Sequence, residues 1–140
     1  MENIPYDKRS GIIWFNGKNI EWSEAKVHVL SHGLHYASCV FEGERVYNGE
    51  IFKLEEHTDR LFYSAKRIGI EVPYSKEDVN KATKQVVDIQ KTLNGYVRPV
   101  IWRGSEMMAI SAQKNKINVA IATWEWGSYF DPKLKIEGIK

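Results

Sequence analysis

The chain has 140 residues, of which 43% are hydrophobic and 27% charged, and its formal net charge at pH 7 is +2. This length suits one compact domain with its own core and is too short for two. No apolar run reaches the roughly 18 residues of a membrane-spanning helix, and interleaved basic and acidic residues argue against a nucleic-acid-binding face. The single cysteine, Cys39, excludes an internal disulfide, and the polar N-terminus does not resemble a signal peptide, so we expect a cytoplasmic protein.

Two β-hairpins are expected in the first half of the chain. The segments "IIWFNGKNIEW" and "ERVYNGEIF" each place Asn-Gly between two runs of strand-forming residues. Asn-Gly readily adopts the two positive φ angles of a type I′ turn, which matches the twist of paired strands. We therefore expect antiparallel strands over Ile12–Asn16, Lys18–Trp22, Cys39–Tyr47 and Glu50–Lys53.

A first helix is expected to start at Leu54. Leu61, Ala65 and Ile68 recur at helical spacing and form an apolar stripe, which Gly69 ends. The polar residues of this helix gather on one edge of the stripe, at His57, Arg60 and Ser64.

A second helix is expected to start at Ser75. The segment "SKED" places Asp78 three residues after the Ser75 hydroxyl, which predicts a capping box. Asn94-Gly95 has the composition of a helix C-cap. The apolar positions expected to face the core are Val79, Ala82, Val86, Ile89 and Leu93.

Two further strands, "GYVRPVIWR" and "KINVAIATWEW", follow the helices. In the first, Tyr96, Arg98, Val100 and Trp102 alternate with Val97, Pro99 and Ile101. Pro99 cannot donate a ladder hydrogen bond, so this strand is expected to have an edge or a bulge there. The second strand is apolar on both faces and is expected to be covered.

These elements predict an α+β, two-layer domain with a mainly antiparallel sheet and two helices packed on one side. We expect an N-terminal tail over 1–11, the domain over 12–130 and the start of a linker over 131–140.

One strand face is the strongest candidate for a binding site. Phe41, Gly43 and Arg45 project from one side of their strand, and Tyr96 and Arg98 project together from a later one. A phenol beside a guanidinium can hold a carboxylate, and a ring beside a glycine leaves a slot for an aliphatic chain. The alternative is that this is an ordinary solvent face with Gly43 at a bulge.

The histidines and the cysteine give weaker signals. His28, His32 and His35 would share a face only in a helix, and Ser31-His32-Gly33 indicates a break, so structural histidines are favoured over a metal site. Cys39 has no neighbouring base and is expected to be a small buried thiol.

Four segments together resemble the small N-terminal domain of branched-chain amino acid aminotransferases, which are pyridoxal-phosphate enzymes of fold type IV. They are "IWFNGKNIEWSEAKVHVLSHGLHYASCVFEGERVY", "EEHTDRLFYSAKRIGI", "GYVRPVIWRG" and "WEWGSYF". The resemblance implies amino transfer between leucine, isoleucine or valine and 2-oxoglutarate. Its partners would be amino acids and 2-oxo acids, without nucleic acid or membrane.

The resemblance implies roles for particular residues. Arg60 of "HTDRL" would hold the cofactor phosphate. Phe41 and Gly43 of "VFEGER" would wall the pocket for the substrate side chain, with Gly43 giving the ligand room. Tyr96 of "GYVRP" would assist the α-carboxylate, and Arg98 would take the distal carboxylate of glutamate.

Five more positions follow from the same resemblance. Trp126 and Tyr129 of "WGSY" would close the pocket. Tyr36 of "LHY", with Met108 and Ile110 of "EMMAI", would reach into the site of a neighbouring subunit. The resemblance therefore implies a homo-oligomer, in the family generally a dimer.

The family's cofactor chemistry is expected to lie outside these residues. Its tethering lysine, and the carboxylate that keeps the pyridine nitrogen protonated, belong to a large C-terminal domain that this sequence does not match. Lys133, Lys135 and Lys140 match no catalytic position of the family. We therefore expect no catalytic residue here, no covalently held pyridoxal phosphate and no activity of this chain alone, although a separate C-terminal domain chain could complete it.

Two alternatives stay open. The chain could be a non-catalytic truncated module, or part of another type IV enzyme such as a D-amino acid aminotransferase. The forms "FEGER" and "GYVRP" favour the branched-chain enzymes. Glu44 departs from the pattern, because many relatives have an apolar residue there.

Overall fold

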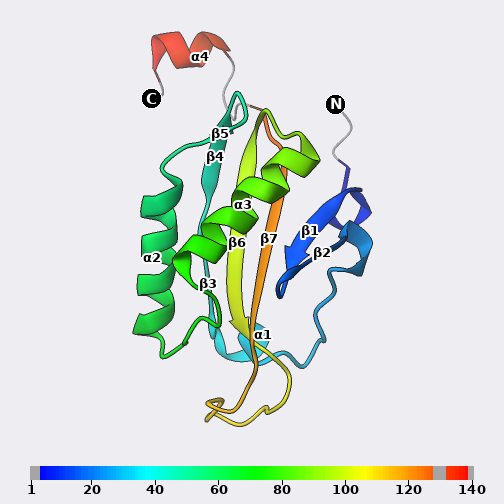
Figure 1. Ribbon diagram of the computed structural model, residues 1–140, viewed down its shortest axis with the longest axis vertical. Coiled ribbons are helices and arrows are strands. Elements are labelled where there is room, and N and C mark those ends of the chain that lie inside the picture. The colour runs from blue at the N-terminus through cyan, green and yellow to red at the C-terminus, as the bar shows by residue number, and fades with distance from the viewer. Residues whose placement is uncertain (1–3, 128–131, 139–140) are drawn as a thin grey trace.

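A computed structural model describes residues 4–127 and 132–138 of the chain (Figure 1). Its helices are η1 Tyr6–Lys8, η2 Trp22–Glu24, α1 His32–Tyr36, α2 Leu54–Arg67, α3 Lys76–Gln90 and α4 Pro132–Glu137. Its strands are β1 Ile12–Phe15, β2 Lys18–Glu21, β3 Cys39–Phe41, β4 Glu44–Tyr47, β5 Glu50–Ile51, β6 Asn94–Arg103 and β7 Ile117–Glu125. The domain boundaries expected at residues 11 and 130 stay a prediction.

The strands form one antiparallel sheet in the order β2-β1-β7-β6-β4-β5, with β3 also paired to β6. The two long helices, α2 and α3, both pack on one face of this sheet (Figure 1). The predicted α+β, two-layer architecture is therefore confirmed. No helix of residues 4–127 and 132–138 is long and apolar enough to cross a membrane.

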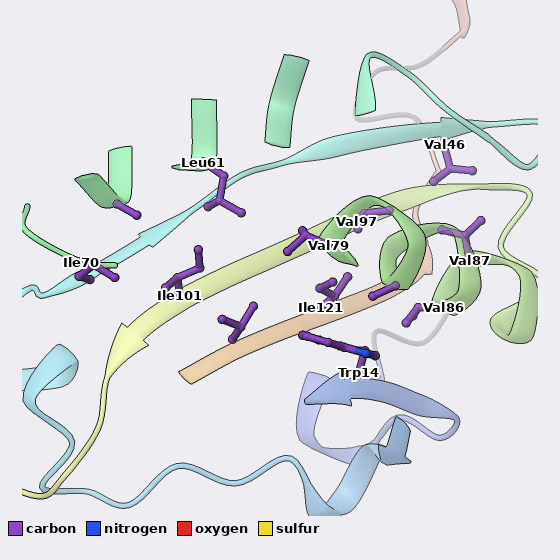
Figure 2. Close-up of a cluster of buried hydrophobic side chains, with 13 residues drawn as sticks. Trp14, Val46, Leu61, Ile70, Val79, Val86, Val87, Val97, Ile101 and Ile121 are labelled. Atoms are coloured by element: carbon purple, nitrogen blue, oxygen red, sulfur yellow. The ribbon is translucent and has the colours of Figure 1, made fainter. Parts of the chain in front are cut away.

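The main core fills the space between the sheet and the two helices (Figure 2). Helix residues Leu61 of α2 and Val86 of α3 meet Val97 of β6 and Ile121 of β7, and all four are fully buried. A second, smaller cluster, with Ile13, Trp22, Trp102 and Ala120, lies on the other side of the sheet. Its members include Trp102, whereas Ile101 belongs to the main core, so the alternation predicted for β6 is confirmed.

Both Asn-Gly turns form as predicted. Asn16 and Gly17 have φ angles of 49° and 90°, and Asn48 and Gly49 have 52° and 83°. The pairs Phe15↔Lys18 and Tyr47↔Glu50 close the two hairpins. These turns depend only on the two residues in them, which explains why the sequence was sufficient.

The single strand expected over Cys39–Tyr47 is interrupted at Glu42 and Gly43, between β3 and β4. Both strands pair with β6, with Phe41 opposite Val100 and Glu44 opposite Val97. The register is unchanged across the gap, so no extra residue is inserted and the alternation of faces continues.

Pro99 lies opposite this gap, and its carbonyl accepts a hydrogen bond of 3.1 Å from the Glu42 N–H. The nitrogen and carbonyl of a strand residue point to the same edge, so the missing N–H of Pro99 falls where the ladder is broken. Because β6 is paired on both sides, the expected edge or bulge at Pro99 is wrong.

The helices follow their predictions except at their C-terminal ends. Ser75 and Asp78 form the predicted capping box, with hydrogen bonds of 3.0 and 3.2 Å. α3 ends at Gln90, with Lys91 in the left-handed region, so Leu93 lies beyond the helix and is exposed instead of buried. Ile89, in the last turn of α3, is also exposed. Ile68 is also exposed, because α2 has already ended at Arg67.

The predicted C-cap at Asn94-Gly95 is wrong, because these residues begin β6. A Cβ on Gly95 would overlap the Thr92 side chain and the Trp124 carbonyl. Gly95 is therefore needed for close packing of β6 against β7.

Candidate functional site

Aromatic rings gather on the sheet face opposite α2 and α3, at the end where β6 begins. Tyr96 of β6 and Trp124 of β7 are register partners, and their ring centroids are 5.3 Å apart. Trp126 lies 4.9 Å from Tyr96, and Tyr6 lies 5.2 Å from Trp124. We call the four rings of Tyr6, Tyr96, Trp124 and Trp126 the aromatic cluster. Of these four, Tyr6 and Trp124 were not predicted as site residues. Their place in the cluster follows only from their ring contacts in the structure.

Arg98 is held at the edge of the aromatic cluster by two neighbours. Its guanidinium lies 4.2 Å from the ring centroid of Phe41, and its Nη2 donates a 3.1 Å hydrogen bond to the Tyr96 hydroxyl. Its Nε is buried, and no residue that the structure describes accepts a hydrogen bond from it. The structure thus brings Phe41, Tyr96 and Arg98 together, as the counting of strand faces predicted.

Gly43 makes room for a protein group. A Cβ at this position would overlap the hydroxyl oxygen of Tyr96. The space beside Gly43, expected to receive the ligand directly, is therefore filled by the Tyr96 phenol. Gly43 lets that phenol reach the Arg98 guanidinium.

Trp126 is tied to β4 as well as to the aromatic cluster. The Nη2 of Arg45 donates a 3.1 Å hydrogen bond to the Trp126 carbonyl oxygen. Trp126 therefore lies beside Tyr96, where the resemblance implies that it closes the pocket. Tyr129, its expected companion, lies outside the described residues.

A second group of expected site residues lies near α1, at the other end of β6 (Figure 1). The Tyr36 hydroxyl donates a 3.1 Å hydrogen bond to the Met108 carbonyl, and the Tyr36 ring stacks on His32. Ile110 is 89% exposed. The structure does not bring these residues to Arg98, and their role toward a neighbouring subunit stays a prediction.

His32 is a structural histidine, as expected. It is buried, its Nδ1 lies 2.7 Å from the Ser38 Oγ, and its Nε2 lies 3.0 Å from the Ala109 carbonyl. The expected break lies at Ser31, which is extended, and α1 starts after it at His32, so His28 shares no helix with His32 and His35. Within the part of the chain that the structure describes, no group of His, Cys, Asp and Glu could hold a metal ion.

Arg60 is clamped by a buried carboxylate that sequence reasoning missed. Its Nε and Nη2 donate to Oε1 and Oε2 of Glu42 at 2.6 and 2.7 Å, and His57 Nδ1 lies 2.9 Å from Oε2. Burial raises the pKa of Glu42, but the hydrogen bonds and charges of Arg60 and His57 outweigh burial and lower it. Because strand faces alternate, the position of Glu42 between Phe41 and Gly43 was a usable signal that it faces the helix layer.

Glu44 is a second buried acid, with 1% of its surface exposed. Burial, and secondarily the charge of Glu42, raise the pKa of Glu44 to about 8. Its Oε2 has no hydrogen-bond partner among the described residues. Glu44 is therefore mostly a neutral acid at pH 7, and the alternation that places Glu42 on the helix side places Glu44 there too.

An apolar hollow of about 300 Å³ adjoins Arg98 on the same face of the sheet. Its walls include Phe15, Val100, Trp102 and the half-buried Cys39. Burial raises the pKa of the Cys39 thiol, which makes it a poorer nucleophile at neutral pH.

This sheet with its helices is the small domain of a fold type IV aminotransferase. The structure matches the T.th. branched-chain amino acid aminotransferase, solved with pyridoxamine 5′-phosphate, with a TM-score of 0.84 and 38% identity over 89% of this chain and 43% of that one. The Escherichia coli enzyme matches with a TM-score of 0.83 and 35% identity, over 89% and 43% of the two chains.

Sequence comparison agrees with the fold. The family described as amino-transferase class IV matches residues 39–139, and the chain belongs to that family. It is 42% identical over 136 residues to branched-chain-amino-acid aminotransferase of Pseudomonas aeruginosa, which covers 94% of this chain and 44% of the relative. The chain thus spans less than half the length of the curated relatives it matches.

Proposed function

We propose that the protein transfers amino groups between branched-chain amino acids and 2-oxoglutarate with pyridoxal phosphate as cofactor. In this proposal the 140 residues supply the arginine that holds the cofactor phosphate and one wall of the substrate site. The observation that carries it is Arg98, a cation held by Phe41 and Tyr96 at the border of an apolar hollow. The names of the similar enzymes support the same substrate class.

The site must accept two kinds of side chain, and Arg98 suits both. The glutamate carboxylate would pair with the guanidinium, whose contacts in the described part of the chain are the Phe41 ring and the Tyr96 ring and hydroxyl. A branched hydrocarbon would instead lie against the Phe41 ring and the apolar wall, with the Arg98 head left in water. Gly43 contributes by seating the Tyr96 phenol that orients Arg98.

Arg60 fits the cofactor phosphate. Its side chain is 65% exposed, and Glu42 engages only its Nε and Nη2. Nη2 also lies 3.4 Å from His57 Nδ1, whereas Nη1 takes no part in the contacts with Glu42 and His57. Phosphate oxygens accept hydrogen bonds from such a guanidinium donor. When bound, pyridoxal phosphate supplies the electron sink that the amino acid's α-carbon needs.

Further parts of the proposal concern what lies outside these residues. The resemblance assigns the tethering lysine to a large C-terminal domain, so we propose that this chain alone does not transaminate and does not hold pyridoxal phosphate covalently. Mixing the purified chain with pyridoxal phosphate is expected to give no visible absorbance band from one defined lysine. A stoichiometric band that borohydride fixes at one lysine contradicts this part.

We also propose that a second copy of the chain covers the surface of Tyr36, Met108 and Ile110. The exposure of the Tyr36 ring and of Ile110 supports this, because large apolar side chains seldom stay in water together. Sedimentation is expected to show a dimer, and Ile110→Glu is expected to shift it toward monomer. A strict monomer in the unaltered chain counts against the dimer.

A hybrid enzyme tests the proposed activity. The 140 residues replace the matching segment of the Pseudomonas aeruginosa relative, whose remaining sequence is unchanged. The hybrid is expected to transfer the amino group of L-leucine to 2-oxoglutarate, and to leave D-alanine unused. A folded, cofactor-loaded hybrid that prefers D-alanine would assign the chain to another type IV activity.

A further inference from the structure

Glu42 occupies an unusual place for an acid. It lies in the gap between β3 and β4, its backbone N–H is bonded to the Pro99 carbonyl, and only 5% of its side chain is exposed. Its two oxygens receive Arg60 and His57 at 2.6 to 2.9 Å. With both oxygens engaged and the backbone tied to the central strand, the carboxylate has one orientation.

This fixed carboxylate holds an otherwise exposed side chain. An arginine that is 65% exposed is usually free to change rotamers, and ordering it opposes ligand binding. Here the Nε and Nη2 edge of Arg60 is bound side-on to Glu42, so the plane and the direction of the guanidinium are set in advance. Nη1, on the opposite edge, takes no part in these contacts, and the side chain as a whole is 65% exposed.

We propose that Glu42 is a positioning residue that orients Arg60 for the phosphate of the cofactor, an inference that rests on the proposed role of Arg60. Glu42 acts by geometry, because its own negative charge repels a phosphate. A positioning role therefore requires the reach of the glutamate side chain as well as its charge. An aspartate keeps the charge but is shorter by one methylene, which separates the two effects.

The test uses the 140-residue chain labelled with 15N and the Nε–H resonance of Arg60. The ligand is pyridoxine 5′-phosphate, which has no aldehyde to react with surface lysines, and pyridoxine is the phosphate-free comparison. Glu42→Asp is expected to speed the exchange of the Arg60 Nε–H with water. It is also expected to weaken binding of pyridoxine 5′-phosphate about tenfold, the size of one lost charge-assisted hydrogen bond, and to leave binding of pyridoxine unchanged.

Two more variants complete the design. Glu56→Asp shortens an exposed acid of α2, the helix that carries Arg60. Glu56 pairs with Lys53, so this variant is expected to leave phosphate binding unchanged. Arg60→Lys keeps the charge but loses the fork, so it is also expected to weaken binding about tenfold. Arg60 is exposed, so Arg60→Lys is expected to fold. It therefore tests the positioning role if Glu42→Asp does not fold.

The outcomes separate the two claims. If the Arg60 resonance of the unaltered chain ignores pyridoxine 5′-phosphate, the proposed phosphate role of Arg60 fails. If it responds, but Glu42→Asp binds as tightly as the unaltered chain, the positioning role fails while the role of Arg60 stands. If Glu42→Asp is unfolded, equal affinity in Arg60→Lys overturns the positioning role, because charge alone would then suffice.

Discussion

Glu44 offers a direct test of the energetics of this domain. It is 1% exposed, it is paired with Val97 in the sheet, and its neighbour Val46 belongs to the apolar core. Replacing it with Gln keeps the size of the side chain and removes the carboxyl that titrates. We expect Glu44→Gln to change how the free energy of unfolding depends on pH.

The magnitude follows from the pKa of Glu44, which burial raises from 4.5 to about 8. Between these values the folded state keeps a proton on Glu44 that the unfolded state has released. The contribution of Glu44 to the free energy of unfolding therefore falls as pH rises through this window and becomes level above pH 8. At 1.36 kcal/mol per pH unit the total loss is at most about 5 kcal/mol.

Urea unfolding between pH 5 and pH 9 measures this loss. The unaltered chain is expected to lose several kcal/mol relative to Glu44→Gln across the range, of the order worked out above. Glu71→Gln, which changes an exposed acid, is the matched control and is expected to run parallel to the unaltered chain. Parallel curves for the unaltered chain and Glu44→Gln would refute the raised pKa of Glu44.

Two further substitutions test local geometry. Gly43→Ala is expected to displace the Tyr96 ring and to lower the free energy of unfolding in urea by about 1–3 kcal/mol. Part of this loss is expected to be recovered in the double variant Gly43→Ala/Tyr96→Phe. If the double variant instead loses the full sum of the two single losses, the two residues do not touch. Ser75→Ala removes the side-chain cap of α3 and is expected to cost about 1 kcal/mol. An unchanged urea midpoint would contradict the stabilising role of the capping box.

Features that depend on adjacent residues could be predicted from the sequence. The Asn16-Gly17 turn and the Ser75 capping box are fixed by residues within one turn of each other, so no knowledge of the rest of the fold was needed. The alternation along β6 was also predictable, because one strand carries the whole pattern. These local rules, combined, gave the sheet and the helix layer.

Features that depend on distant residues were missed. The Glu42 carboxylate meets Arg60 only because α2 packs beside the β3–β4 gap. The exposure of Leu93 follows from the start of β6, which ends the helical pattern early. The space beside Gly43 looked free in one strand, but Tyr96 from another strand fills it. Predicting each of these features would have required the order of the strands in the sheet, which the spacing of residues along one strand does not give.

The resemblance drew attention to a residue that local patterns do not single out, and its role in a site stays a prediction. It indicated Trp126, and the structure places this residue 4.9 Å from Tyr96. It assigned no role to Glu42 and noted Glu44 only as a departure from the family pattern, because the burial of both acids is seen only in the structure. The structure therefore added the knowledge that two acidic side chains are buried.

The proposed substrate site is tested most directly by the substrate preference of the hybrid enzyme with Arg98→Gln. We predict that kcat/KM for glutamate falls about a hundredfold, because the charge pair between the guanidinium and the distal carboxylate is lost, while kcat/KM for leucine changes less than about threefold. Arg67→Gln, at an exposed arginine of α2, is the control and is expected to change neither value. Equal losses for glutamate and leucine, or no loss for either, would contradict the role of Arg98 as the group that recognises the distal carboxylate.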